Sequence, residues 1–145
     1  MAGSGTAHLR EGDIVMRVEN LVMEFPVGRT GLKVNAVSGI SFDVMRGETL
    51  GLVGESGCGK STTGKAMMQI PRPTSGSIKL DGLELTTLGN EELRSARTKM
   101  QMIFQDPISS LNPRRIVRDS VREPLDVWSR GSKAEREALV DRVLE

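Results

Sequence analysis

The chain has 145 residues, which is enough for one domain with its own hydrophobic core. Lys and Arg total 20 and Asp and Glu total 19, so the net charge of +1 gives no bulk electrostatic reason to expect nucleic-acid binding. Aromatic residues make up 3% of the chain and Tyr is absent, which argues against stacking platforms for single-stranded nucleic acid. The single cysteine, Cys58, excludes an internal disulfide.

The part of the chain before residue 49 is typical of short antiparallel strands. Residues 1–13 are rich in small and polar residues, and we expect them to form a flexible tail. Alternation of apolar and polar residues predicts strands over Ile14–Phe25, Lys33–Val37 and Ile40–Val44. In the last of these strands the apolar residues share one face, and Ser41 and Asp43 share the other.

The pattern changes at Thr49. The segment Thr49–Val53 has no charged residue and predicts a strand buried on both faces, as in a parallel sheet. A glycine-rich loop follows, and then a helix from about residue 60 to residue 70, which Pro71 and Pro73 end. This order of strand, loop and helix indicates an α/β domain.

Further elements are predicted after this helix. Asp81-Gly82 predicts a hairpin that joins two short strands. Ser132, with Glu135 three residues later, predicts a capping box at the start of a helix. The strands predicted after residue 70 are Ser77–Leu80, Leu83–Leu85 and Lys99–Gln105. The predicted helices are Glu91–Arg97, capped by Asn90, a helical segment with Val117 and Val121 before Pro124, and the helix after Ser132.

The segment Gly54–Ser61 carries the chemistry. Its sequence, Gly-Glu-Ser-Gly-Cys-Gly-Lys-Ser, fits the phosphate-binding P-loop pattern G-x-x-x-x-G-K-[ST]. The glycines allow a concave nest of main-chain N–H groups, and the positive end of the following helix dipole adds to their attraction for phosphate. Lys60 would place an ammonium beside the β and γ phosphates, and Ser61 would offer its hydroxyl to Mg²⁺. A chance glycine-rich turn before a helix is the alternative interpretation.

Several segments resemble the ATPase subunits of ABC transporters. Leu52–Thr62 resembles their Walker A segment, and Asn20–Phe25 is similar to their adenine-stacking A-loop. Pro73–Gly82 resembles the hairpin after the P-loop helix, and Met102–Pro107 resembles the Q-loop. Ser110–Arg114 narrows the resemblance to the oligopeptide/dipeptide importer branch, and within it to the F-type subunit.

The resemblance covers nearly the whole chain after the tail, and it implies an α/β fold. We expect residues 14–105 to form an N-terminal antiparallel β-subdomain and a P-loop NTPase core, and residues 106–145 to start a helical subdomain that is truncated. Lys60 and Gln105 would be catalytic, Ser61 and Gln105 would bind Mg²⁺, and Phe25 would stack on adenine. The nucleotide-binding residues would be Phe25, Gly54, Glu55, Ser56, Gly57, Cys58, Gly59, Lys60, Ser61 and Thr62.

The implied function is coupling of MgATP binding and hydrolysis to peptide uptake, at the cytoplasmic face of the cell membrane. The implied partners are membrane-spanning permease subunits, a second ATPase subunit and, indirectly, a substrate-binding protein, with no nucleic acid. The 145 residues contain no signature segment, Walker B strand or switch histidine, so we expect an N-terminal half that binds nucleotide weakly without turnover.

Two other functions remain open at this point. One is a soluble ABC-type ATPase in translation or DNA repair, against which the near-neutral charge and the Ser-Leu-Asn-Pro stretch weigh. The other is a P-loop kinase or GTPase, against which the antiparallel strands before the P-loop weigh.

Overall fold

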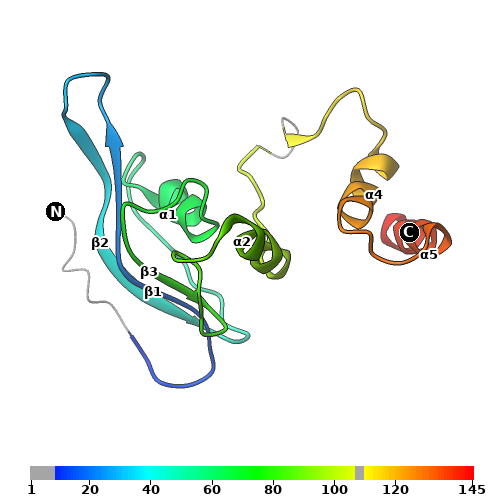
Figure 1. Ribbon diagram of the computed structural model, residues 1–145, viewed down its shortest axis with the longest axis horizontal. Coiled ribbons are helices and arrows are strands. Elements are labelled where there is room, and N and C mark those ends of the chain that lie inside the picture. The colour runs from blue at the N-terminus through cyan, green and yellow to red at the C-terminus, as the bar shows by residue number, and fades with distance from the viewer. Residues whose placement is uncertain (1–8, 107–109) are drawn as a thin grey trace. The chain divides into compact units, whose positions relative to one another are not determined.

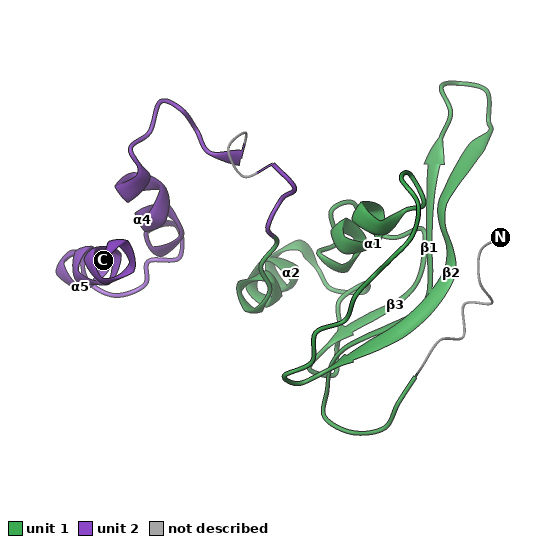
Figure 2. Ribbon diagram, turned by 180° about the vertical axis from the view of Figure 1, so that it is seen from behind, with its two compact units in different colours: residues 1–102 green, residues 103–145 purple. Residues whose placement is uncertain are grey.

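The computed structural model describes residues 9–106 and 110–145, and the chain divides into two compact units, Met1–Met102 and Ile103–Glu145 (Figure 2). In the first unit a four-stranded antiparallel sheet has the order β2-β1-β3-β4, and helices α1 and α2 lie on the same side of it (Figure 1). The strands are β1 (Ile14–Pro26), β2 (Lys33–Met45), β3 (Ser75–Leu80) and β4 (Leu83–Glu84). The helices are α1 (Lys60–Met67), α2 (Asn90–Ala96), the 3₁₀ helix η1 (Arg97–Lys99), α4 (Val117–Val127) and α5 (Lys133–Leu144).

The strands β1 and β2 form a long antiparallel ribbon. The two strands predicted between residues 33 and 44 are one continuous strand, because Gly39 adopts a φ of 71° and lets the chain pass through an irregularity. In β1, Asn20 adopts a φ of 50°, and the register shifts between Val18 and Leu21. A strict period of two cannot anticipate such bulges, since each one changes which side chains face the core.

The core of the first unit lies between the sheet and the two helices. Its fully buried side chains include Val18, Leu21, Met23, Ile78 and Leu85. Two polar residues of β2 are buried as well, although the sequence pattern places them opposite the apolar face of that strand. Ser41 accepts a hydrogen bond from the main-chain N–H of Asn20 at 2.8 Å, and Asp43 is paired with Arg10. Buried polar groups of this kind need such partners.

Two predicted strands are absent from the described part of the chain. Thr49–Val53 is irregular, and Val53 is 94% exposed rather than buried on both faces. The segment Lys99–Gln105 is also irregular apart from the end of η1, and Ile103 is 91% exposed. A strand needs a neighbour for its main-chain hydrogen bonds, and in residues 9–106 and 110–145 no segment pairs with either one.

The hairpin and the short helix after it form close to their predicted positions. Asp81 and Gly82 adopt φ values of 46° and 78°, the left-handed pair that a tight two-residue hairpin turn requires. The predicted cap of α2 is wrong by one residue, because Gly89 rather than Asn90 is the N-cap. Glu92 accepts a hydrogen bond from the N–H of Gly89 at 3.0 Å and so satisfies one of the free donors at this end of the helix.

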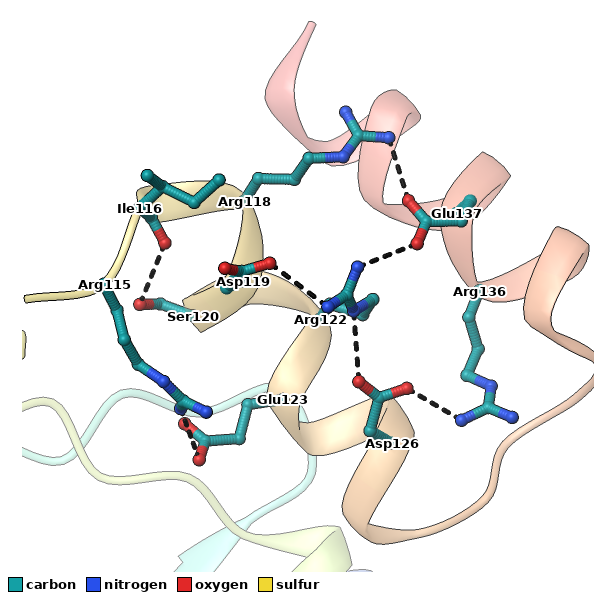
Figure 3. A network of polar contacts seen from close by, with 10 residues as sticks. All are labelled: Arg115, Ile116, Arg118, Asp119, Ser120, Arg122, Glu123, Asp126, Arg136 and Glu137. Carbon is teal, nitrogen blue, oxygen red and sulfur yellow. Dashed lines mark hydrogen bonds and ion pairs between the residues drawn. The ribbon is translucent and has the colours of Figure 1, made fainter.

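The second unit contains α4 and α5. The Ser132–Glu135 capping box forms as predicted, whereas α4 continues through Pro124 to Val127. Ion pairs join the two helices (Figure 3). Arg122 of α4 contacts Glu137 of α5 at 2.8 Å, and Arg118 contacts the same carboxylate at 3.0 Å. The described helices include none that is both long enough and apolar enough to cross a membrane.

Candidate functional site

The glycine-rich loop leads directly into α1. The main-chain N–H of Cys58 donates to the carbonyl oxygen of Glu55 at 3.3 Å and closes a turn at the tip of the loop. Gly57 and Gly59 have φ values of 81° and 96°, a region that favours glycine. The first N–H groups of α1 have no partner within the helix, so this end of the helix offers donors to an anion.

The ammonium group of Lys60 lies back across the loop. Its Nζ atom donates to the carbonyl oxygens of Gly54 at 2.8 Å and Glu55 at 2.6 Å, and lies 3.6 Å from Sγ of Cys58. Neutral carbonyls hold the ammonium in place without cancelling its charge. A lysine held in this way can meet a phosphate group as a point charge.

The loop is fixed to the sheet at Gly59. A Cβ atom at this position would lie 2.2 Å from the carbonyl oxygen of Ala36 in β2, so only glycine fits there. The carbonyl oxygen of Gly59 accepts hydrogen bonds from the main-chain N–H of Thr63 at 2.8 Å and from its hydroxyl at 3.0 Å. Thr63 is itself buried, so the first turn of α1 is held against β2.

A cavity of about 630 Å³ lies between the loop and β2. This volume is within the range of small-molecule sites in proteins. Its lining combines the P-loop with the middle of β2 and comprises Asn35, Ala36, Val37, Ser38, Ile40, Leu52, Val53, Gly54, Glu55, Cys58, Gly59, Lys60 and Thr63. The site therefore offers main-chain donors and an ammonium at one side and a mixed polar and apolar wall from β2.

The structure brings together only part of the predicted set of site residues. Gly54, Glu55, Cys58, Gly59 and Lys60 line the cavity. Of the other predicted loop residues, Ser56, Gly57 and Ser61 are exposed and Thr62 is half-buried at the start of α1.

The two predicted residues outside the loop are less closely tied to it. Phe25 lies near the end of β1, opposite Val34 of β2 and 38% exposed, and is not among the residues that line the cavity. Gln105 is exposed and belongs to the second unit. That Gln105 and Ser61 bind the same Mg²⁺ therefore stays a prediction.

A cluster of charges holds the turn that leads into Thr49–Val53. Arg10 donates to both carboxylate oxygens of Glu48, at 2.8 and 2.6 Å, and to Asp43 at 2.7 Å. The hydrogen bonds from Arg10 lower the pKa of Glu48 to about 2. Burial opposes ionisation of Asp43, but the hydrogen bonds from Arg10 outweigh it and the pKa of Asp43 is lowered. Arg10 therefore anchors part of the segment predicted to be a loose tail.

Two groups that hold the loop and α1 in place carry no sequence signal. Ala36 contributes a main-chain carbonyl, which any residue possesses. Arg97 donates to carbonyl oxygens at the C-terminal end of α1, and its sequence neighbourhood gives no reason to link it to that helix. Among the residues that the structure describes, no group of three His, Cys, Asp or Glu side chains could hold a metal ion without other ligands.

Comparison with solved structures agrees with this architecture. The chain superposes on the ATP-binding cassette MJ0796, solved as a dimer in a post-hydrolysis state bound to ADP and Pi, with a TM-score of 0.73. The match covers 88% of this chain and 54% of the cassette at 24% identity, and therefore shows a shared fold. The fold is thus that of an ABC ATPase cassette, as the sequence predicts.

Sequence comparison identifies closer relatives. The chain is 41% identical over 139 residues to the oligopeptide transport ATP-binding protein AppF of Bacillus subtilis, which covers 91% of this chain and 42% of AppF. It is 47% identical over 123 residues to the glutathione import ATP-binding protein GsiA of Escherichia coli, which covers 81% of this chain and 20% of GsiA. The chain thus spans less than half the length of these relatives. The sequence profile of the ABC transporter family matches residues 37–145, and the chain belongs to this family.

Proposed function

We propose that this chain binds MgATP at the loop Gly54–Ser61 and is part of the ATP-binding subunit of an ABC importer for peptides. The observation that supports this best is the Lys60 ammonium, held by two carbonyls at the edge of a cavity of about 630 Å³. The names of AppF and GsiA, which refer to oligopeptide transport and glutathione import, support peptides as the transported class.

Each loop residue has a role that follows from its chemistry. The main-chain N–H groups of the loop and of the first turn of α1 would bind the phosphate oxygens. Lys60 would lie beside the β and γ phosphates, and Thr62 would donate to the α phosphate. Phe25 would stack on adenine and Gln105 would orient the attacking water.

Mg²⁺ fits the residues that are present. Ser61 is exposed in the first turn of α1, where its hydroxyl can serve as a ligand. Mg²⁺ prefers oxygen ligands and usually combines few protein groups with phosphate oxygens and water, so the Ser61 hydroxyl would supply one ligand and Gln105 a second. When bound, the ion would neutralise charge on the phosphates.

The intact importer would add what this chain lacks. We propose that a second ATPase subunit, membrane-spanning permease subunits and, indirectly, a substrate-binding protein complete the assembly at the cytoplasmic face of the membrane. Hydrolysis needs a group that activates water and stabilisation of the transferred phosphoryl group from several directions. We therefore propose that the 145-residue chain binds MgATP weakly and does not turn it over.

Titration with a fluorescent ATP analogue in the presence of Mg²⁺ tests this function. We expect a saturable signal from the chain and an increase in Kd of about tenfold or more for Lys60→Ala, because a charge-assisted contact of about 1.4 kcal/mol or more is lost. Lys65→Ala is the matched control, since Lys65 is an exposed lysine near the other end of α1. Equal affinities of the two variants, or no saturable binding, would contradict the proposal. Phosphate release that depends on Lys60 would contradict the absence of turnover.

A further inference from the structure

Helix α1 is weak when considered alone. It has eight residues, and Thr62, Thr63 and Gly64 are poor helix formers in its middle. Its N-cap, Gly59, supplies no side-chain hydrogen bond. Isolated helices of fewer than about 12 residues are marginal in water. The orientation of α1, and of the donors at its first turn, therefore depends on contacts with the rest of the fold, among them the burial of Ala66 in the core and the contacts at its two ends.

The C-terminal end of α1 is closed by the chain itself. Gln69 adopts a left-handed conformation with a φ of 57°, and its N–H donates to the carbonyl oxygen of Ala66 at 2.8 Å. The N–H of Ile70 donates to the carbonyl oxygen of Lys65 at 2.9 Å. These are the two hydrogen bonds of a Schellman motif. They end the helix but do not attach it to the rest of the protein.

Arg97 adds a polar attachment at this end of the helix, beside the core packing of Ala66. Its Nε atom donates to the carbonyl oxygen of Met68 at 3.0 Å, and its Nη2 atom donates to the carbonyl oxygen of Gln69 at 2.9 Å. The guanidinium thus places two hydrogen bonds and a positive charge at the negative end of the helix dipole. Arg97 comes from η1, 28 residues after Gln69 in the sequence, so the contact joins two separate parts of the fold.

The stretch that carries Arg97 continues along α1. A Cβ atom placed on Gly64 would lie 3.7 Å from Cε of Met102, so the Met102 side chain lies beside the middle of the helix. At the other end of the helix Gly59 is packed against Ala36, as described above. α1 is therefore held between β2 at its first turn and the stretch 97–102 at its middle and its last turn.

We infer that Arg97 is a positioning residue for the nucleotide loop: by holding the carbonyls of Met68 and Gln69, which directly follow α1, it keeps the first turn of that helix in place to receive phosphate. The inference rests on the proposed nucleotide binding but concerns a residue outside the loop. A residue with a general structural role would lower stability without a selective effect on α1 or on nucleotide affinity.

A matched arginine makes the inference testable. Arg72 also donates to main-chain carbonyls, those of Leu88 at 2.8 Å and Thr86 at 3.4 Å, but its acceptors lie between β4 and α2 rather than on α1. We expect Arg97→Met to lower the unfolding temperature at least as much as Arg72→Met, because the hydrogen bonds of Arg97 are partly buried and those of Arg72 are exposed. At a temperature where both variants are folded, Arg97→Met should raise the Kd for the fluorescent ATP analogue about tenfold and Arg72→Met should leave it within about twofold. Arg97→Lys should recover only part of the affinity, since it keeps the positive charge but loses the planar two-point donor that reaches both carbonyls.

Amide hydrogen exchange of the ligand-free protein gives a readout that does not depend on nucleotide binding. In Arg97→Met, exchange should become about tenfold faster across residues 61–68, whereas in Arg72→Met it should not change there. Unchanged exchange in α1, or equal changes in the two variants, would overturn the inference even if ATP binds. Absence of saturable binding by the wild-type chain would refute the proposed function. In that case, faster exchange in Arg97→Met but not in Arg72→Met would still support the role of Arg97 in holding α1.

Discussion

Replacing Gly59 with alanine should distort the loop more than the same change at Gly57. Both glycines have positive φ values, 96° and 81°, and an alanine in such a conformation costs about 1–2 kcal/mol. At Gly59 the new Cβ would also lie 2.2 Å from the carbonyl oxygen of Ala36, whereas at Gly57 it would have no neighbour within 4 Å. The carbonyl belongs to β2 and cannot move freely, so the overlap adds about 1–3 kcal/mol.

We therefore expect Gly59→Ala to lower the free energy of unfolding by about 2–5 kcal/mol, and Gly57→Ala by about 1–2 kcal/mol. Urea denaturation followed by circular dichroism measures both values. The fluorescent ATP titration should show a larger loss of affinity for Gly59→Ala, because the loop has to move away from β2. Equal destabilisation by the two substitutions would refute the reasoning, since it would mean that the close approach to Ala36 does not constrain the loop.

Three further changes test other parts of the structure. The pKa of Glu48 is about 4.3 in the unfolded chain and about 2 in the folded chain. Its contribution to the free energy of unfolding is therefore present above about pH 4.3 and is lost as the pH falls toward about 2. In urea titrations at several pH values, Glu48→Gln should make the free energy of unfolding fall less steeply over this pH range. Leu50, Leu52 and Val53 are 44%, 47% and 94% exposed, and we expect the chain to self-associate through this apolar stretch. Val53→Lys should therefore lower light scattering without lowering the unfolding temperature. Arg122→Gln should speed amide exchange in both α4 and α5, since Arg122 pairs with Glu137 across the two helices; a wild-type rate would contradict this.

The features that the sequence predicted well depend on neighbouring residues. The Asp81-Gly82 turn, the Ser132–Glu135 box and the change from glycine-rich loop to helix at Lys60 each need a few residue types at short, fixed spacing. Their geometry is determined within one turn or one loop. For this reason the sequence predicts the positions of these features to within one or two residues.

The features that it missed depend on residues that are distant in the sequence. Asp43 is buried because Arg10, 33 residues earlier, pairs with it, and no local pattern indicates that pair. Thr49–Val53 has the composition of a buried strand but no hydrogen-bonded neighbour in the described residues. Composition predicts that a strand is possible, whereas pairing decides whether it forms.

The unpaired segment also explains why nucleotide binding by this chain should be weak. The loop is fixed on one side, where Gly59 packs against β2, but on its other side the nearest anchor is Glu48, several residues before Gly54. Binding has to order the intervening segment, and the free energy of that ordering is subtracted from the affinity. Amide exchange at residues 49–53 should therefore be fast in the free chain and slow down when MgATP is added. If exchange there were already slow without nucleotide, the segment would be preorganised, and this explanation of weak binding would be wrong.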